Sequence, residues 1–219
     1  MVKNKKLLFL RSAIITLIVF GTGILLGVAL DNYKENSVLT DLKFNELDTQ
    51  SYFLEEAFIK DSEKNICEIL QSRIDNLKHS LIKIGTELRN NEVSSISKSS
   101  DLDYLKRKYT LSEVQFLMLL KDLKKDCNSK YIPILFFYTK DEPVCMNQGY
   151  ILTWAYEKYK KNVVVLSFDK DYEDEPLIKT LKLQYGVQEK STVVIDGKTY
   201  STFLTKEELN EILTGLIPS

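Results

Sequence analysis

The stretch IPILFFYTKDEPVCMNQGYI, residues 132–151, constrains the fold of this chain more than any other part of the sequence. Its run ILFFYT is too apolar for a strand that faces solvent on one side, so it predicts a strand in the centre of a sheet. A turn with Pro143 follows, and a helix is predicted from about Val144 to Lys161, with Cys145 near its start. The next run, NVVVLSF, predicts a second buried strand, and such strand–helix–strand units pair in parallel with a right-handed crossover.

The remaining C-terminal sequence predicts four further elements. The segment DYEDEPLIKTLKLQYGV begins a helix with acidic residues in its first turn, and Gly186 ends that helix. The segment STVVIDGKTYSTF predicts a hairpin, because Asp196-Gly197 is a two-residue turn sequence. The segment TKEELNEILTGL predicts an amphipathic helix in which Thr205 and Glu208 are spaced as a capping box. The predicted order over residues 131–217 is β-α-β-α-β-β-α, which defines an α/β domain.

This order and two motifs resemble the thioredoxin family. The segment FFYTKDEPVCMNQGYIL is similar to the strand and helix start that carry the family's C-x-x-C. The segment YGVQEKSTVVIDGKTY is similar to the family's Y-x-(I/V)-x-x-x-P-T, which is followed by a strand and D/N-G-K. The resemblance places Glu142-Pro143-Val144-Cys145 on the C-x-x-C, and Ser191 on the cis-proline that faces it. The whole chain also resembles membrane-anchored thioredoxin-like proteins with a helical stalk, known from archaea.

Two substitutions in this motif alter the chemistry that the resemblance implies. Family enzymes attack a disulfide with a low-pKa thiolate at the helix start, and a second cysteine resolves the mixed disulfide. Glu142 cannot attack sulfur, and a carboxylate close to Cys145 raises the pKa of that thiol. Ser191 replaces the proline that guides the substrate backbone. Cys145, which matches the resolving cysteine, is the candidate catalytic residue; the other interpretation is a cysteine that faces the core.

An apolar segment near the N-terminus predicts a membrane anchor. No charge interrupts the sequence from Ser12 to Leu30, and about 20 apolar residues in a helix span a ~30 Å hydrocarbon core. We expect residues 1–6 to be cytoplasmic and residues 7–30 to form a transmembrane helix in contact with lipid. The alternative is a cleaved signal peptide, although its apolar region is usually shorter, about 7–15 residues.

The charges that flank this segment predict its orientation. Basic residues precede the span, which places the N-terminus in the cytoplasm and residues 31–219 outside the cell membrane, in a single-pass arrangement. Gly23 and Gly27 form one GxxxG, a spacing that allows two such spans to pack as a homodimer and that is also common by chance.

Residues 31–130 predict a helical stalk. Residues 36–130 contain no proline and a single glycine, Gly85. Apolar residues at alternating steps of three and four form a coiled-coil seam: Cys67, Leu70, Ile74, Leu77, Leu81, Ile84 and Leu88. A second stripe, on which Glu113 is the one charge, consists of Leu102, Leu105, Tyr109, Phe116, Leu120, Leu123 and Cys127. Because the polar segment NNEVSSISKSS separates two helices of similar length, they predict an antiparallel hairpin.

The hairpin brings two cysteines to the same height. Cys67 and Cys127 lie at about the same distance from the connecting loop, and both belong to the apolar stripes. In a chain outside the membrane this placement predicts a disulfide, which contributes about 3–4 kcal/mol to stability. The other interpretation is two free cysteines that are buried as small apolar side chains.

Composition narrows the functions that remain. A net charge of −1 and a pI of about 6.0 give no support for nucleic-acid binding. Three cysteines without a CxxC, and one histidine, do not fit a zinc site, so no metal or other cofactor is expected. We therefore interpret the chain as an anchored, outward-facing protein whose redox-degenerate domain binds an envelope protein or serves as a scaffold. The alternatives are a thiol-disulfide oxidoreductase or isomerase that works through Cys145, and a spacer without a specific partner.

Overall fold

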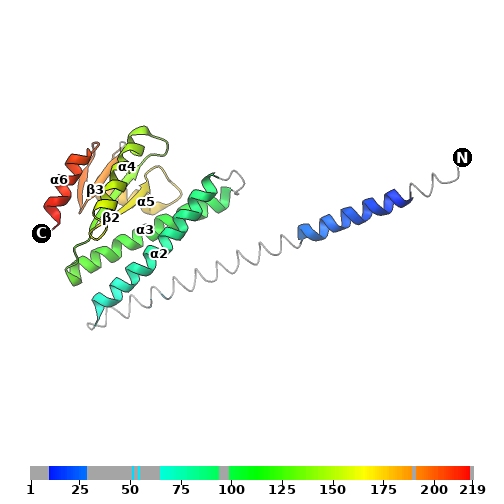
Figure 1. Cartoon of the computed structure of the whole chain (residues 1–219), viewed down its shortest axis with the longest axis horizontal. Coiled ribbons are helices and arrows are strands. Elements are labelled where there is room, and N and C mark those ends of the chain that lie inside the picture. Colours follow the sequence, from blue (N-terminus) through cyan, green and yellow to red (C-terminus); the bar gives the residue numbers. More distant parts are fainter. Residues whose placement is uncertain are drawn as a thin grey trace. The chain divides into compact units, whose positions relative to one another are not determined.

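The computed structural model describes residues 10–28, 51, 54, 65–93, 99–188 and 191–217. The chain divides into two compact units, residues 1–63 and 64–219. In the first unit, Leu10–Val28 forms a helix whose mean hydropathy is 1.9, long and apolar enough to cross a membrane (Figure 1, blue). A signal sequence passes the same test of length and composition, so both interpretations of this segment stay open. The predicted cytoplasmic residues 1–6 and the first part of the predicted stalk, residues 31–50, lie outside the described residues.

The second unit contains the predicted α/β domain together with two long helices. Its elements, in chain order, are α2 (Ile66–Val93), α3 (Ser99–Cys127), β1 (Ile132–Tyr138), α4 (Pro143–Lys158), β2 (Val163–Asp169), α5 (Pro176–Tyr185), β3 (Thr192–Ile195), β4 (Lys198–Tyr200) and α6 (Lys206–Leu216). The predicted order β-α-β-α-β-β-α is therefore confirmed from β1 onward.

The described strands form a four-stranded sheet in the order β2-β1-β3-β4. β1 pairs in parallel with β2, in the register Ile132 to Val163, and antiparallel with β3, which pairs antiparallel with β4. The predicted hairpin turn is confirmed, because Asp196 and Gly197 have φ values of 47° and 87°, the left-handed conformation that a tight hairpin turn needs. β1 has neighbours on both sides, which explains its continuous apolar sequence.

Each face of the sheet has its own apolar core. Leu152, Leu209 and Leu213, from α4 and α6, pack on one face with Ile134 and Ile195. The other core combines residues from α2, α3 and α5 with residues of the sheet: Leu70, Ile74, Phe116, Leu120, Ile178, Leu181, Phe137 and Phe168. Figure 1 shows α2 and α3 running beside each other next to the strands. The two helices that the sequence interpretation assigned to a stalk thus cover one face of the sheet, because that face would otherwise expose its phenylalanines to water.

The two helices are antiparallel and are joined at one end. The Sγ atoms of Cys67 and Cys127 are bonded, and the Cα atoms of the two residues are 5.5 Å apart. Farther along, Gly85 of α2 lies against the Tyr109 ring of α3, where a Cβ on the glycine would be 3.2 Å from the ring. The disulfide therefore ties the start of α2 to the end of α3, immediately before the chain enters β1.

Local capping follows the sequence. Thr205 and Glu208 form the predicted capping box at the start of α6: each side chain accepts a hydrogen bond from the backbone N–H of the other residue. Gly186 ends α5 in the left-handed conformation with φ 63°, as its position after the helix predicts.

Candidate functional site

The motif that resembles a C-x-x-C lies where β1 leads into α4. Glu142 is the N-cap residue of α4, and Pro143 occupies the first turn. Proline is favoured there because its fixed φ suits a helix and its missing N–H has no partner within the helix. The connecting loop turns at Asp141, which has a positive φ of 61°. This arrangement directs Cys145, in the first turn of α4, toward the end of β1.

The thiol of Cys145 is buried and engaged in hydrogen bonds. The residue is 4% exposed, and its Sγ donates to Glu142 Oε2 at 3.1 Å. The backbone N–H of Thr139 donates to the same sulfur at 3.3 Å. Burial raises the pKa of the Cys145 thiol, and the hydrogen bond to Glu142 raises it further, whereas the Thr139 N–H and the Ser191 side chain oppose the shift. The balance keeps the thiol protonated, the opposite of an attacking thiolate.

The structure brings three of the five sequence-derived motif positions into contact. Glu142 and Ser191 both interact with the Cys145 sulfur, although Ser191 lies 46 positions later in the chain. Pro143 and Val144 are exposed residues at the start of α4, and neither forms a hydrogen bond with the Cys145 sulfur. The carboxylate thus stands beside the thiol, as expected from the sequence.

No second thiol of this chain accompanies Cys145. The sequence has three cysteines, and the other two, Cys67 and Cys127, are joined to each other. Resolution of a mixed disulfide on Cys145 would therefore need a thiol from another molecule. Among the residues that the structure describes, no group of His, Cys, Asp and Glu side chains could hold a metal ion.

A polar network behind the cysteine was missed from the sequence. Thr139, which donates its N–H to Cys145, donates its hydroxyl to Asp171 Oδ2 at 2.7 Å, and Lys170 Nζ lies 3.0 Å from Asp171 Oδ1. Partial burial acts to raise the pKa of Asp171, but the hydrogen bonds from Thr139 and Lys170 outweigh it and lower that pKa. The contact between Thr139 and Asp171 could have been inferred from the predicted parallel pairing of β1 and β2, because the carboxyl ends of parallel neighbours meet at one edge of the sheet.

Apolar side chains are exposed near this motif. Met146 and Tyr150 lie one turn apart on α4 and are 55% and 71% exposed. Gln148, between them in sequence, is buried, and it both accepts from the N–H of Leu204 and donates to its carbonyl. These two hydrogen bonds fix the backbone of Leu204 against α4, so its exposed neighbour Phe203 also lies close to α4. Exposed aromatic and methionine side chains are typical of protein-binding surfaces.

Removing the carboxylate beside the thiol should increase thiol reactivity. In Glu142→Gln, the pKa of Cys145 is expected to fall, because a negatively charged acceptor of the S–H disappears while the Thr139 N–H remains. The iodoacetamide alkylation rate of Cys145 at pH 8 should rise by a factor of several over wild type, with Glu157→Gln, a matched exposed glutamate on α4, as the control. An unchanged rate would mean that burial alone controls the thiol.

Comparisons with known proteins give structural neighbours but no family. No family model matches the chain, and no curated protein matches it. A solved structure described as that of a malarial protein is similar at 16% identity and a TM-score of 0.34, covering 40% of this chain and 99% of that chain. Thioredoxin-2 of a malaria parasite, described as a component of the protein secretion machinery, is similar at 18% identity and a TM-score of 0.34, covering 39% of this chain and 82% of that chain. Each of these likenesses covers less than half of this chain at under 20% identity. The resemblance to archaeal thioredoxin-like proteins stays a prediction.

Proposed function

We propose that the chain is a membrane-anchored, outward-facing protein whose thioredoxin-like domain binds a partner protein and does not exchange disulfides. One observation carries this proposal: the thiol of Cys145 is buried and donates to Glu142, and no second cysteine of the chain is free to resolve an intermediate. Two-step exchange needs an exposed thiolate and a resolving thiol, so the site lacks both requirements.

Two further observations support the anchored, outward-facing arrangement. The helix Leu10–Val28 has the length and composition of a membrane span. The bond between Cys67 and Cys127 is of a kind that persists in oxidising compartments and is rare in the cytosol. The exposed Met146, Tyr150 and Phe203 then supply a surface for a partner in the envelope.

Turnover of a model disulfide tests the proposal. The full chain in phospholipid nanodiscs should reduce insulin, with dithiothreitol as the reductant, no faster than dithiothreitol alone, and Cys145→Ser should behave identically. Glu142→Cys, which restores a C-x-x-C at the helix start, provides the matched gain-of-function control. Insulin reduction well above the thiol background that Cys145→Ser abolishes would establish the oxidoreductase alternative instead.

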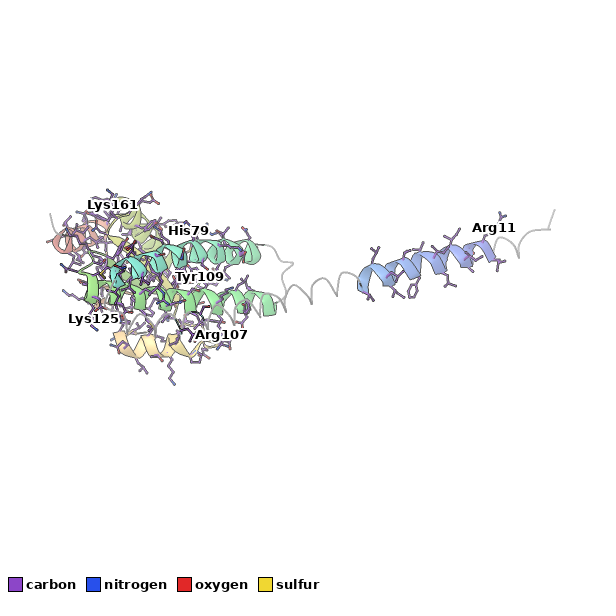
Figure 2. The ribbon with its side chains drawn as sticks, turned by 90° about the horizontal axis from the view of Figure 1, so that it is seen from below. Arg11, His79, Arg107, Tyr109, Lys125 and Lys161 are labelled. Atoms are coloured by element: carbon purple, nitrogen blue, oxygen red, sulfur yellow. A yellow bond between two sulfur atoms is a disulfide. The ribbon has the colours of Figure 1, made fainter. Side chains whose placement is uncertain are left out.

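Partner contact is measured separately in membranes. A photo-crosslinking amino acid at Tyr150 should give a discrete adduct with an envelope protein, whereas the same amino acid at the exposed Lys161, beyond the end of α4, should not (Figure 2). Equal labelling at both positions, or none at Tyr150, would contradict binding through the α4 surface.

A further inference from the structure

One edge of the sheet faces an open groove. β2 is the outermost strand in the order β2-β1-β3-β4, so its outer side pairs with no described strand. A groove of about 340 Å³ runs along Val163–Leu166 of this strand. Tyr109 and Glu113 of α3, together with residues of α2, form one wall, and Tyr156 of α4 belongs to the other. Unpaired strand edges are templates for an added strand, and here the edge lies between two helical walls.

The backbone register identifies which groups face the groove. Ile132 N–H donates to Asn162 C=O, and Lys170 N–H donates to Tyr138 C=O, at the two ends of the β1–β2 ladder. In a parallel ladder alternate residues face the same neighbour, so the even-numbered residues of β2 face β1. Val163, Val165 and Ser167 therefore direct their N–H and C=O groups outward.

Contacts within the chain close both ends of this edge and leave its centre open. The N–H of Val163 donates to Tyr159 C=O at 2.9 Å, and the N–H of Ser167 donates to Glu113 Oε1 at 2.8 Å. Between them, neither the N–H nor the C=O of Val165 has a hydrogen-bond partner among the described residues. From Val163 to Ser167 this edge spans about 13 Å at the usual rise of ~3.3 Å per residue, and the groups of Val165 at its centre are open to a short extended segment.

Glu113 occupies the place that the carbonyl of an added strand would take at Ser167. The side chain is buried, with the residue 2% exposed, and it lines the groove. Its Oε1 accepts from Ser167, while Oε2 is buried and has no hydrogen-bond partner among the described residues. Because burial keeps this carboxyl protonated near neutral pH and Oε1 accepts from Ser167, Oε2 carries the hydrogen. A buried hydroxyl without an acceptor is costly, and a backbone carbonyl of an occupant of the groove would accept it.

The charges around the groove select the chemistry of the occupant. Lys78 and Arg89 of α2 and Lys160, just past α4, line it, against one exposed acid, Asp75. The floor is formed by valine and leucine side chains. We propose that the outer edge of β2 binds an extended segment of a partner protein as an added strand, pairing with Val165, apolar at its centre and acidic at its flanks. This inference rests on the proposed role in protein binding and assigns the partner a place on the domain.

Synthetic peptides test the pairing. A fluorescein-labelled heptapeptide with two glutamates at each end and three valines in the centre should bind the full chain in phospholipid nanodiscs, measured by fluorescence polarisation. Its binding should be at least tenfold tighter than that of the peptide with lysine in place of glutamate. N-methylation at successive backbone nitrogens should weaken binding tenfold or more at alternate positions and leave the intervening positions within about threefold, because alternate N–H groups of a strand face its neighbour.

Matched variants locate the site on the chain. Lys78→Glu with Lys160→Glu should weaken the acidic peptide at least tenfold and remove its preference over the lysine peptide. Lys83→Glu with Lys161→Glu makes the same charge change on α2 and beyond α4 but outside the groove, and should change affinity less than twofold. Val165→Pro, which removes the central N–H while proline stays compatible with an edge strand, should abolish binding without loss of the far-ultraviolet dichroism signal.

The outcomes separate this inference from the proposed function. Absence of binding by the acidic peptide, no alternation on N-methylation, or equal effects of the two charge-inverted variants would overturn the docking site. Self-association of the chain that Val165→Pro abolishes would also overturn it, because a second copy would then occupy the edge. A crosslinked partner at Tyr150 together with no peptide binding would leave the proposed function intact and remove only the β2 edge as its site.

Discussion

Replacing both Cys67 and Cys127 by alanine is expected to lower the free energy of unfolding by roughly 4 kcal/mol. The bond closes a loop between residues 60 positions apart, and such a cross-link restricts the unfolded chain far more than the folded one. It also holds the first turn of α2 against the end of α3, where α2 contributes Leu70 and Ile74 to the core on the sheet. Loss of the bond should therefore loosen α2 before the sheet.

Urea unfolding of the full chain in nanodiscs, followed by the fluorescence of the single tryptophan, Trp154, measures this effect. The variants Cys67→Ala and Cys127→Ala, each alone, should lose nearly as much stability as the double variant, because either change removes the same bond. Treatment of the wild-type chain with a phosphine reductant provides the matched control without any substitution. Single-variant losses that add up to the double-variant loss, or a double variant as stable as wild type, would contradict the prediction.

The second large effect concerns Glu113 and pH. Burial raises the pKa of Glu113 to about 8, even though the hydrogen bond from the Ser167 N–H and the nearby Tyr109 hydroxyl act to lower it. The folded chain therefore holds this proton more tightly than the unfolded chain, in which the pKa is near its ordinary value of 4.5. The stabilisation is fully present below about pH 4.5 and is lost as the pH rises toward 8, at up to about 1.4 kcal/mol per pH unit.

Glu113→Gln should remove this pH dependence. The amide oxygen keeps an acceptor for the Ser167 N–H and carries no charge, so the variant should match wild type near pH 5 and exceed its stability by a few kcal/mol at pH 8. Tyr109 does not titrate in this range, because burial and the neighbouring Glu113 raise its pKa. The charged groups that line the same groove, Asp75, Lys78, Arg89 and Lys160, are common to both proteins and cancel in the comparison.

Urea midpoints of wild type and Glu113→Gln at pH 5, 6.5 and 8 give the two slopes to be compared. Glu87→Gln, at an exposed position on α2 outside the groove, is the matched control and should follow wild type. Parallel slopes for wild type and Glu113→Gln would show that the carboxyl group is not protonated in the folded chain near neutral pH.

Features that depend on neighbouring residues were readable from the sequence. The capping box of Thr205 and Glu208 and the turn at Asp196-Gly197 each involve backbone groups within a few positions, so local propensity determines them. The place of Glu142 beside Cys145 follows from a three-residue spacing in the first turn of α4. Burial, which depends on the fold, is the larger cause of the raised Cys145 pKa; only the further contribution of Glu142 could be anticipated from this spacing.

Features that depend on distant residues could be read only in part. The apolar stripes of α2 and α3 predict that each helix buries one face, but a stripe does not specify what covers it. The interpretation as a stalk buried both apolar stripes against each other within the hairpin. In the structure the two helices also cover the sheet, and their apolar residues pack beside Phe137 and Phe168. Glu113 stood out as the one charge on its stripe, yet its acceptor role became visible only through Ser167, 54 positions away.

The sequence by itself determined the order of elements from β1 to α6, the carboxylate that accompanies Cys145, and an apolar segment long enough to cross a membrane. The tertiary structure alone decided which face α2 and α3 cover, that the Thr139 N–H meets the Cys145 sulfur, and that Glu113 lies at an open strand edge. The physical reason is the distance along the sequence over which each interaction acts. Periodicity and capping report on backbone groups a few residues apart, whereas packing and burial join side chains that only the folded chain brings together.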